Sequence, residues 1–372
     1  MRPKPLPRAD TSVPGDRRRK DIFRRGQLPA TAAVLALGLA ACTGPSESPA
    51  PNTGSTPSLG DRVTTAATDL ESPWSIAVLP DGSALISEND TGVIKHVSDG
   101  RTVASVPIDS PLETTGEGGL MGLAVGPDYA ENQRLFVYLT APQDNRVISY
   151  RWNNGPLSDA QEVVTGIPKS RIHNGGRLEF GPDGHLYVST GDASNSQTAQ
   201  DLDSLGGKIL RVTTDGEPAP GNPFPDSPVY SYGHRNVQGM DWDSLGRLWA
   251  TEFGPTEDDE LNLIEPGQNY GWPAVTGAPG DERYVDAVVV WPSTAEASPS
   301  GMAIVEDVAW IAALRGERLW RVELAEEGAG EPTALLTDKY GRLRDVALSP
   351  EGDLWVLTNG GNPDRMLAVS VK

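Results

Sequence analysis

A hairpin pattern that recurs along the chain is the feature that most limits its fold. Alternating apolar and polar residues enter and leave a Pro-Asp-Gly or Pro-Glu-Gly turn in residues 76–88, 178–190 and 346–358. In such a turn proline fixes φ and glycine accepts a positive φ, so each segment is predicted to be strand, turn, strand. Variants of the pattern occur in residues 123–138, 240–251 and, more weakly, 302–311.

The spacing of the hairpins predicts a β-propeller. They recur roughly every 45–60 residues, which is enough chain for a blade of about four short strands. Six hairpins indicate six blades, so the predicted fold is an all-β, six-bladed β-propeller over residues 61–372. A β-sandwich with similar hairpins is the alternative. In a propeller the loops of all blades gather around one end of a central channel, where a functional site is expected.

Composition agrees with this fold and excludes one class of partner. The chain has 41 glycines and 32 prolines in 372 residues and only 6% aromatic residues, which favours many turns and short strands over long helices. Its formal charge of −20 repels phosphate backbones, and it has no large basic patch. Nucleic acid is therefore not an expected partner.

The N-terminal segment resembles a bacterial lipoprotein signal. An arginine-rich stretch precedes an apolar run too short to span a bilayer, and the run ends in Leu-Ala-Ala-Cys42. We expect a signal peptide over residues 1–41, a diacylglyceryl group on Cys42 and a Pro/Ser/Thr-rich tether over residues 42–60. The protein would then be exported and lipid-anchored on the outer face of the bacterial cytoplasmic membrane. Paired arginines leave Sec and twin-arginine export open.

Four histidines narrow the search for a general base: His96, His173, His185 and His234. His96 follows an apolar strand and His185 lies in a Pro-Asp-Gly turn, so both are expected on the surface. His173 precedes a predicted blade strand, and the hairpin that follows can return Asp192 to the same rim. A histidine backed by a carboxylate is the usual arrangement of a base, because the carboxylate sets the tautomer and stabilises the imidazolium.

The next blade carries a second polar cluster. Residues 232–240 place a cation, an amide and two glycines ahead of a predicted strand, and residues 251–255 follow that strand. Residues 258–262 and 268–273 add carboxylates, amides and aromatic rings. This density of oxygen donors suits Ca²⁺ better than Zn²⁺, which prefers Cys or His. A solvated acidic loop is the alternative interpretation.

Together these segments resemble the soluble PQQ-dependent aldose sugar dehydrogenase (glucose/sorbosone dehydrogenase) family, along most of the predicted mature chain. The matching motifs occur in the family's order at residues 72–74, 79–82, 116–123, 173–176, 191–192, 206–211, 233–239, 252–255, 259–262, 269–273 and 341–345. Any one of these motifs is weak evidence, whereas the ordered set is highly specific.

The resemblance implies that the C1 hydroxyl of an aldose sugar is oxidised to a lactone by hydride transfer to the C5 carbonyl of PQQ. Carried over motif by motif, His173 would take the hydroxyl proton and Asp192 would orient His173. Arg235 would lie over the quinone and stabilise charge that develops on its oxygens, with Asn236 beside it. The sequence does not identify the electron acceptor that would reoxidise the cofactor.

The resemblance also implies ligands for a cation and for the carboxylates of PQQ. The backbone carbonyls of Gly254 and Pro255 would hold the Ca²⁺ that binds PQQ and polarises its reactive carbonyl. Glu252 and Asn262 resemble a second, structural Ca²⁺ site. The arginines expected to pair with PQQ carboxylates are Arg342 and Arg344, with Arg315 in the place of a further cation.

One position departs from the family pattern, because Glu117 stands where the family has a glutamine. A carboxylate facing an anionic cofactor would need compensation by Arg235, by Ca²⁺ or by a proton. Alternatively, Glu117 bonds the backbone amides of its own glycine-rich loop. Two other functions fit the propeller: a Ca²⁺-dependent lactonase or esterase, and a non-catalytic binding propeller on the cell surface.

Overall fold

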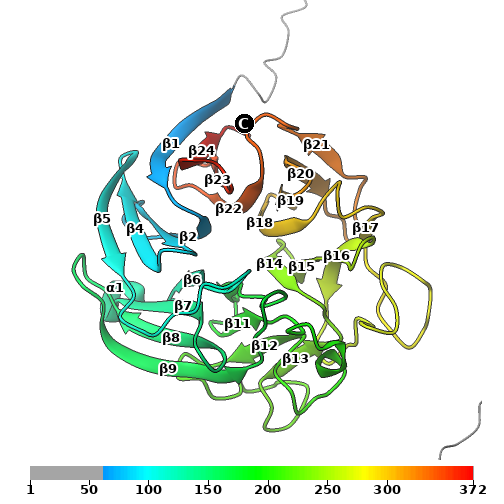
Figure 1. Cartoon of the computed structure of the whole chain (residues 1–372). Coiled ribbons are helices and arrows are strands. Elements are labelled where there is room, and N and C mark those ends of the chain that lie inside the picture. The colour runs from blue at the N-terminus through cyan, green and yellow to red at the C-terminus, as the bar shows by residue number, and fades with distance from the viewer. Residues whose placement is uncertain (1–61, 372) are drawn as a thin grey trace, which may run out of the picture. The chain divides into compact units, whose positions relative to one another are not determined.

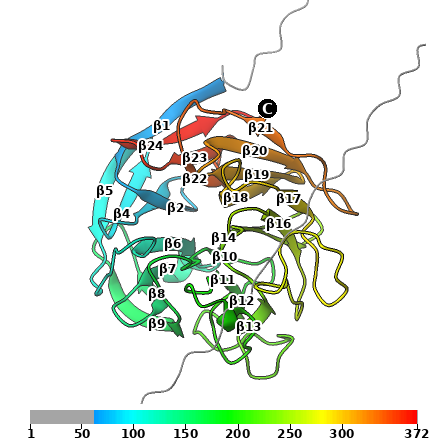
Figure 2. The ribbon, with the colours of Figure 1, turned by 45° about the vertical axis from the view of Figure 1, so that its right-hand side comes forward.

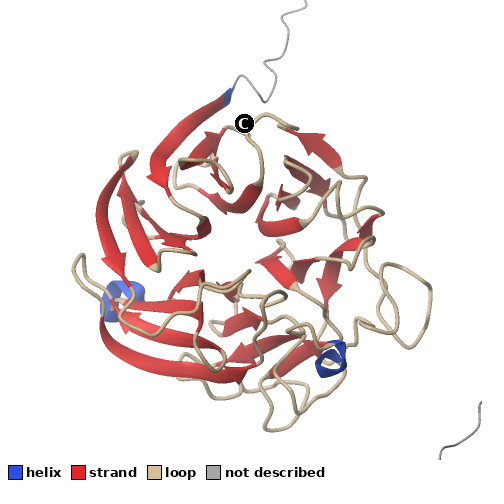
Figure 3. Cartoon of the chain, viewed as in Figure 1, coloured by secondary structure: helices blue, strands red, loops and turns tan. Residues whose placement is uncertain are grey.

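The computed structural model describes residues 62–371 as six four-stranded antiparallel sheets set radially around a centre (Figure 1). Residues 62–371 are almost entirely strand and loop (Figure 3), apart from the short helix α1 (Tyr129–Asn132) and the 3₁₀ turn η2 (Ser196–Ala199). The expected signal peptide, tether and lipidated Cys42 lie outside the described residues. Within residues 62–371, no helix is long and apolar enough to cross a membrane.

Each blade is a run of four strands ordered from the channel outward. Blade 1 consists of β2 (Pro73–Val78), β3 (Ala84–Glu88), β4 (Val93–Ser98) and β5 (Arg101–Pro107). Blade 2 consists of β6 (Leu120–Val125), β7 (Arg134–Thr140), β8 (Asn145–Arg151) and β9 (Ser158–Ile167). Blade 3 consists of β10 (Leu178–Phe180), β11 (Leu186–Ser189), β12 (Lys208–Val212) and β13 (Val229–Tyr232).

The second half of the chain repeats this plan. Blade 4 consists of β14 (Val237–Trp242), β15 (Leu248–Glu252), β16 (Asp259–Ile264) and β17 (Val289–Trp291). Blade 5 consists of β18 (Pro299–Val305), β19 (Val308–Ala313), β20 (Arg318–Glu323) and β21 (Thr333–Leu335). Blade 6 consists of β22 (Leu343–Leu348), β23 (Leu354–Thr358), β24 (Asp364–Val369) and β1 (Val63–Leu70).

Strand β1 closes the ring. It is the first strand of the chain, yet it pairs antiparallel with β24, from Val63 opposite Val369 to Leu70 opposite Asp364. The first strand of the propeller is thus the outermost strand of blade 6, and β1 and β24 lie side by side in Figure 2. This pairing joins the two ends of the repeat array by main-chain hydrogen bonds, which an open array lacks.

All six predicted hairpins form the two innermost strands of a blade, which confirms the six-bladed propeller. The weakest of them, in residues 302–311, joins β18 to β19 through Glu306 and Asp307, which both have positive φ (52° and 58°). Two consecutive positive-φ residues define the tight turn that matches strand twist. The turn was weak in the sequence because neither residue is glycine.

One expectation about the histidines is wrong. His96 in β4 is buried at 9% exposure instead of lying on the surface. Its Nε2 lies 2.9 Å from the hydroxyl of Ser83, and its ring meets the Trp152 ring edge-on at 5.0 Å. Blades pack face to face, so a polar strand residue that would face solvent in an isolated blade is covered by the neighbouring blade. His185 does lie in a turn, where it is half-buried.

A buried ion pair crosses the centre of the propeller. Arg177 follows a pair of glycines and directly precedes β10. Its Nη1 donates to Asp345 of β22 at 2.9 Å and to Ser75 of β2 at 3.0 Å. Its Nε donates to the carbonyl of Gln238 in β14 at 2.9 Å. The side chains of Arg177 and Asp345 are each 3% exposed. One side chain of blade 3 therefore contacts blades 1, 4 and 6.

Removing one charge of this pair should destabilise the propeller. Arg177→Met leaves a buried carboxylate without its partner, so we expect the free energy of unfolding to fall by about 3–5 kcal/mol. The double variant Arg177→Met with Asp345→Asn removes both charges and should lose less than Arg177→Met alone. Urea denaturation of the three proteins measures this. Equal or greater loss in the double variant would contradict a coupled ion pair.

Candidate functional site

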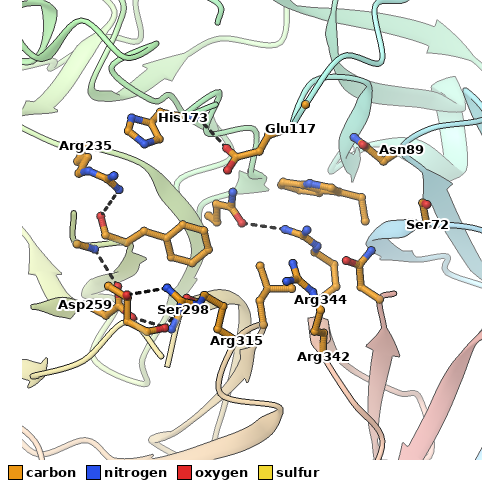
Figure 4. A pocket seen from close by; sticks show the side chains of 18 of the residues that line it. Ser72, Asn89, Glu117, His173, Arg235, Asp259, Ser298, Arg315, Arg342 and Arg344 are labelled. Atoms are coloured by element: carbon orange, nitrogen blue, oxygen red, sulfur yellow. Dashed lines mark hydrogen bonds between the residues drawn. The ribbon is translucent and has the colours of Figure 1, made fainter. Parts of the chain in front are cut away.

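A pocket of about 440 Å³ opens at one end of the central channel. Most of its residues lie in the loops that enter the innermost strands or leave the second strands, and the others lie in strands next to those loops. The antiparallel order brings these positions to the same end of every blade. Figure 4 shows His173 and Arg235 on one side, with Glu117 next to His173, and Arg342 and Arg344 on the opposite side. The expected gathering of loops around the channel is thus observed.

His173 and Asp192 form the predicted pair. Nδ1 of His173 lies 2.8 Å from Oδ1 of Asp192, and the side chains are 12% and 2% exposed. Burial by itself would raise the pKa of Asp192, but hydrogen bonds from His173, Trp272 and the Ser194 amide lower it. An ionised carboxylate only accepts hydrogen bonds, so Nδ1 of His173 carries the proton. In the neutral ring of this tautomer Nε2 has the free lone pair that a general base requires.

Glu117 reaches across from the neighbouring loop and holds the backbone of His173. Its Oε2 accepts the His173 N–H at 2.7 Å, and its own N–H donates to the carbonyl of Arg171 at 2.8 Å. His173 has a left-handed backbone (φ 62°), so this bond supports a conformation that a non-glycine residue rarely adopts. Glu117 lines the pocket, as expected, but the amide that it binds belongs to His173 and not to its own loop.

Arg235 points into the same side of the pocket. Its Nη1 donates to the carbonyl of Phe253 at 3.0 Å, and its guanidinium lies 5.5 Å from the centre of the Trp272 ring. Asn236, expected beside the cofactor, is fully buried and does not line the pocket. Its Oδ1 accepts the Gly175 N–H at 2.9 Å, so it supports the loop that carries His173.

The three other predicted arginines line the pocket. Arg344 donates from Nη1 to Gln238 at 2.9 Å, while its buried Nε has no partner among the described residues. Burial, and then the nearby Arg342, lower the pKa of Arg344 to about 10. Arg315 donates to the hydroxyl of Thr294 at 3.1 Å. A buried guanidinium with an unused donor and a second arginine beside it favours an anionic ligand.

Gly254 and Pro255 lie at the pocket wall, and Asp259, which was not predicted as a site residue, holds the Gly254 peptide. Asp259 accepts the Gly254 N–H at 2.9 Å and the Ser298 N–H at 2.6 Å. A Cβ on Gly254 would lie 1.9 Å from the carbonyl oxygen of Glu257, so only glycine fits there. In residues 62–371 no hydrogen bond to the carbonyl of Gly254 or Pro255 is found, and both oxygens are available as ligands.

Glu252 and Asn262, the predicted second cation site, lie outside the pocket that Gly254 and Pro255 line. The Glu252 carboxylate accepts Nδ1 of His234 at 2.9 Å and the backbone N–H groups of Arg235 and Asn236. Both of its oxygens thus accept hydrogen bonds, whereas Oδ1 of Asn262 is buried and has no partner within the described region.

Three aromatic or amide side chains at the site were missed as site residues: Trp74, Gln238 and Trp272. Trp74 lines the pocket with the Arg344 guanidinium 5.8 Å from its ring and that of Arg177 at 4.6 Å. The sequence placed Trp74 and Trp272 inside family motifs, which is the signal that pointed to them. What they contact depends on neighbouring blades and cannot be read from their own segments.

Known proteins are similar in sequence to this propeller over most of its length. Residues 70–367 match the Glucose / Sorbosone dehydrogenase family. The aldose sugar dehydrogenase of Escherichia coli is 31% identical over 330 residues, which cover 78% of this chain and 88% of the relative. The chain belongs to the glucose/sorbosone dehydrogenase family.

The propeller is also similar to solved structures of aldose sugar dehydrogenases. The PQQ-bound aldose sugar dehydrogenase of Streptomyces coelicolor is 47% identical, with a TM-score of 0.78, and the match covers 83% of this chain and 98% of that one. Quinoprotein glucose dehydrogenase B of Acinetobacter calcoaceticus is 31% identical, but the match covers only 54% of its length and 59% of this chain. The chain matches the aldose sugar dehydrogenases over more of their length than the longer glucose dehydrogenase.

The bond between Glu117 and His173 predicts how the loop that carries His173 responds to substitution. Glu117→Ala removes the acceptor of the His173 N–H, so we expect hydrogen–deuterium exchange at that amide to become about tenfold to a hundredfold faster. Glu117→Gln keeps an acceptor oxygen and should stay near the wild-type rate. The rates are measured on peptides that contain residue 173; equal protection in wild type and Glu117→Ala would show that this bond does not hold the loop.

Proposed function

We propose that this dehydrogenase oxidises the C1 hydroxyl of aldose sugars to lactones, with PQQ as cofactor, Ca²⁺ beside it and His173 as the base. The observation that carries the proposal is the arrangement of the pocket. A histidine with a free lone pair lies on one side, and arginines with unused hydrogen-bonding capacity lie on the other.

The charges of the pocket fit a polyanionic cofactor. Among the described residues, four arginines line it, Arg235, Arg315, Arg342 and Arg344, against the three carboxylates of Asp90, Glu117 and Asp259. With one Ca²⁺ the excess positive charge matches the three carboxylates of PQQ. Trp74 and Phe253 add flat apolar surfaces for a planar ring system. The relative from Streptomyces coelicolor, solved in its PQQ-bound form, supports this choice of cofactor.

Gly254 and Pro255 are the residues that would hold the cation. Backbone carbonyls are suitable ligands for Ca²⁺, and Asp259 keeps the Gly254 peptide in place. These two residues carry the Ca²⁺ proposal because they line the pocket, whereas Glu252 and Asn262 do not. Bound there, the ion would offset the charge of Glu117 and of the cofactor.

PQQ supplies a two-electron acceptor when bound, and the chain's own residues handle the proton. Nε2 of His173 takes the proton of the C1 hydroxyl while the C1 hydrogen leaves as hydride, so the sugar loses two electrons and two hydrogens and C1 becomes the lactone carbonyl. Asp192, 2.8 Å from Nδ1, stabilises the imidazolium that forms. Arg235 lies on the same side of the pocket and stabilises negative charge that develops there.

Reconstitution tests the proposal. Purified protein with PQQ and Ca²⁺ together should reduce an artificial dye in the presence of aldoses, and a chelator should abolish the reaction until Ca²⁺ is restored. His173→Gln should bind PQQ normally and lose about 10²–10⁴-fold in kcat, because the base is absent. Lactone hydrolysis without dye reduction would favour the lactonase, and neither activity would favour a binding propeller.

We also propose that the protein is exported and anchored through Cys42, because this cysteine ends the Leu-Ala-Ala-Cys sequence after an apolar run. Cys42→Ala should abolish lipid labelling and release the protein from the membrane fraction. Cys42→Ser serves as a second thiol-free variant with a similar side-chain volume. Unchanged membrane retention of both variants in detergent-free fractions would contradict the anchor.

A further inference from the structure

Trp272 lies between the two catalytic elements of the site. It belongs to the loop between β16 and β17, and its backbone N–H donates to the carbonyl of Gly233 at 2.9 Å. Gln200 donates to the Trp272 carbonyl at 2.7 Å. The side-chain amides of Gln200 and Asn269 also donate a hydrogen bond to each other. The backbone on both sides of the indole is therefore held by blades 3 and 4.

The indole contacts both charged partners of the site. Its Nε1 donates to Oδ2 of Asp192 at 2.8 Å, while Oδ1 of the same carboxylate faces His173. The Arg235 guanidinium lies 5.5 Å from the centre of its ring. We propose that Trp272 is a positioning residue that sets the orientation and the proton affinity of His173 through Asp192. The catalytic role of His173 rests on the proposed function, but this hydrogen-bonding role does not.

The physical reason is the division of one carboxylate between two donors. Because Trp272 holds Oδ2, the carboxylate cannot rotate about its Cβ–Cγ bond, and Oδ1 stays directed at Nδ1 of His173. The indole N–H also withdraws negative charge from Asp192, so the carboxylate stabilises the imidazolium less strongly. Trp272 thus keeps the ring neutral, and ready to accept a proton, at lower pH than it would be without the indole.

The other groups around Asp192 do not duplicate this contact. The Ser194 N–H donates to Oδ1, the oxygen that already faces His173, at 2.7 Å. Arg235 contributes positive charge to Asp192, and that charge is shared with Glu117, Glu252 and Asp259. Among the described residues, only Trp272 donates a hydrogen bond to Oδ2 of Asp192.

Trp272→Phe tests the inference, because it deletes the donor and keeps an aromatic ring beneath Arg235. In protein without cofactor, NMR follows the pH titration of the His173 ring, which is assigned among four histidines with a His173→Asn variant. We expect the titration midpoint to rise by about one pH unit in Trp272→Phe. In enzyme loaded with PQQ and Ca²⁺, the acid limb of kcat/KM should move in the same direction, and kcat should fall about tenfold at neutral pH with KM retained.

Trp249→Phe is the matched control. Trp249 also donates from Nε1 to a carboxylate, Asp243 at 2.9 Å, but neither residue lines the pocket. Loss of this bond should lower stability and leave the titration of His173 in place. An equal shift in both variants would overturn the inference, because it would show a general effect of destabilisation. No shift in Trp272→Phe would overturn it as well.

A measurement on the unmodified protein keeps the inference testable if Trp272→Phe does not fold. The indole N–H resonance of Trp272 should move with the titration of the His173 ring, since both donors share one carboxylate. An indole resonance that ignores this titration would overturn the inference. These NMR experiments need neither sugar nor cofactor, so they can succeed even if dye reduction fails and the proposed function is wrong.

Discussion

The buried guanidinium of Arg177 is the contact on which the centre of this propeller depends. A charge that is 3% exposed is costly unless it is paired, and Arg177 finds Asp345 across the channel together with acceptors from β2 and β14. The neighbouring backbone is shaped to admit this pair: a Cβ on Gly301 would lie 1.8 Å from Oδ1 of Asp345. Contacts among four blades therefore converge on one ion pair.

The pocket is built directly on this centre. Arg177 lies 4.6 Å from the centre of the Trp74 ring, and the backbone of Gln238 accepts its Nε–H while the side chain of Gln238 accepts Arg344. The same residues thus form the wall of the pocket and the contacts of the channel. The Arg344 guanidinium is therefore held in place by Gln238 and Trp74 without a ligand, so its position is preorganised for an anion.

The opposite side of the pocket is organised around the backbone of one histidine. His173 has a left-handed conformation, and Glu117 and the Ala193 N–H bind its peptide groups while Asp192 binds its ring. This contact accounts for a glutamate where the family has a glutamine, because either side chain offers an oxygen to the His173 N–H. The negative charge is tolerated because Arg235 and Arg344 lie close enough to interact with it.

The sequence alone determined the local units of this protein, and the tertiary structure decided how they meet. Proline–acid–glycine turns and alternating strands specify three of the hairpins and related local patterns mark the other three, so blade number and fold class were predictable. Family motifs likewise marked His173, Asp192 and the arginines. The pairing of β1 with β24, the burial of His96 and the contacts of Arg177, Glu117 and Trp272 were not predictable. Each of these joins segments that are distant in the sequence, and a local pattern carries no information about which surface of another blade will face it.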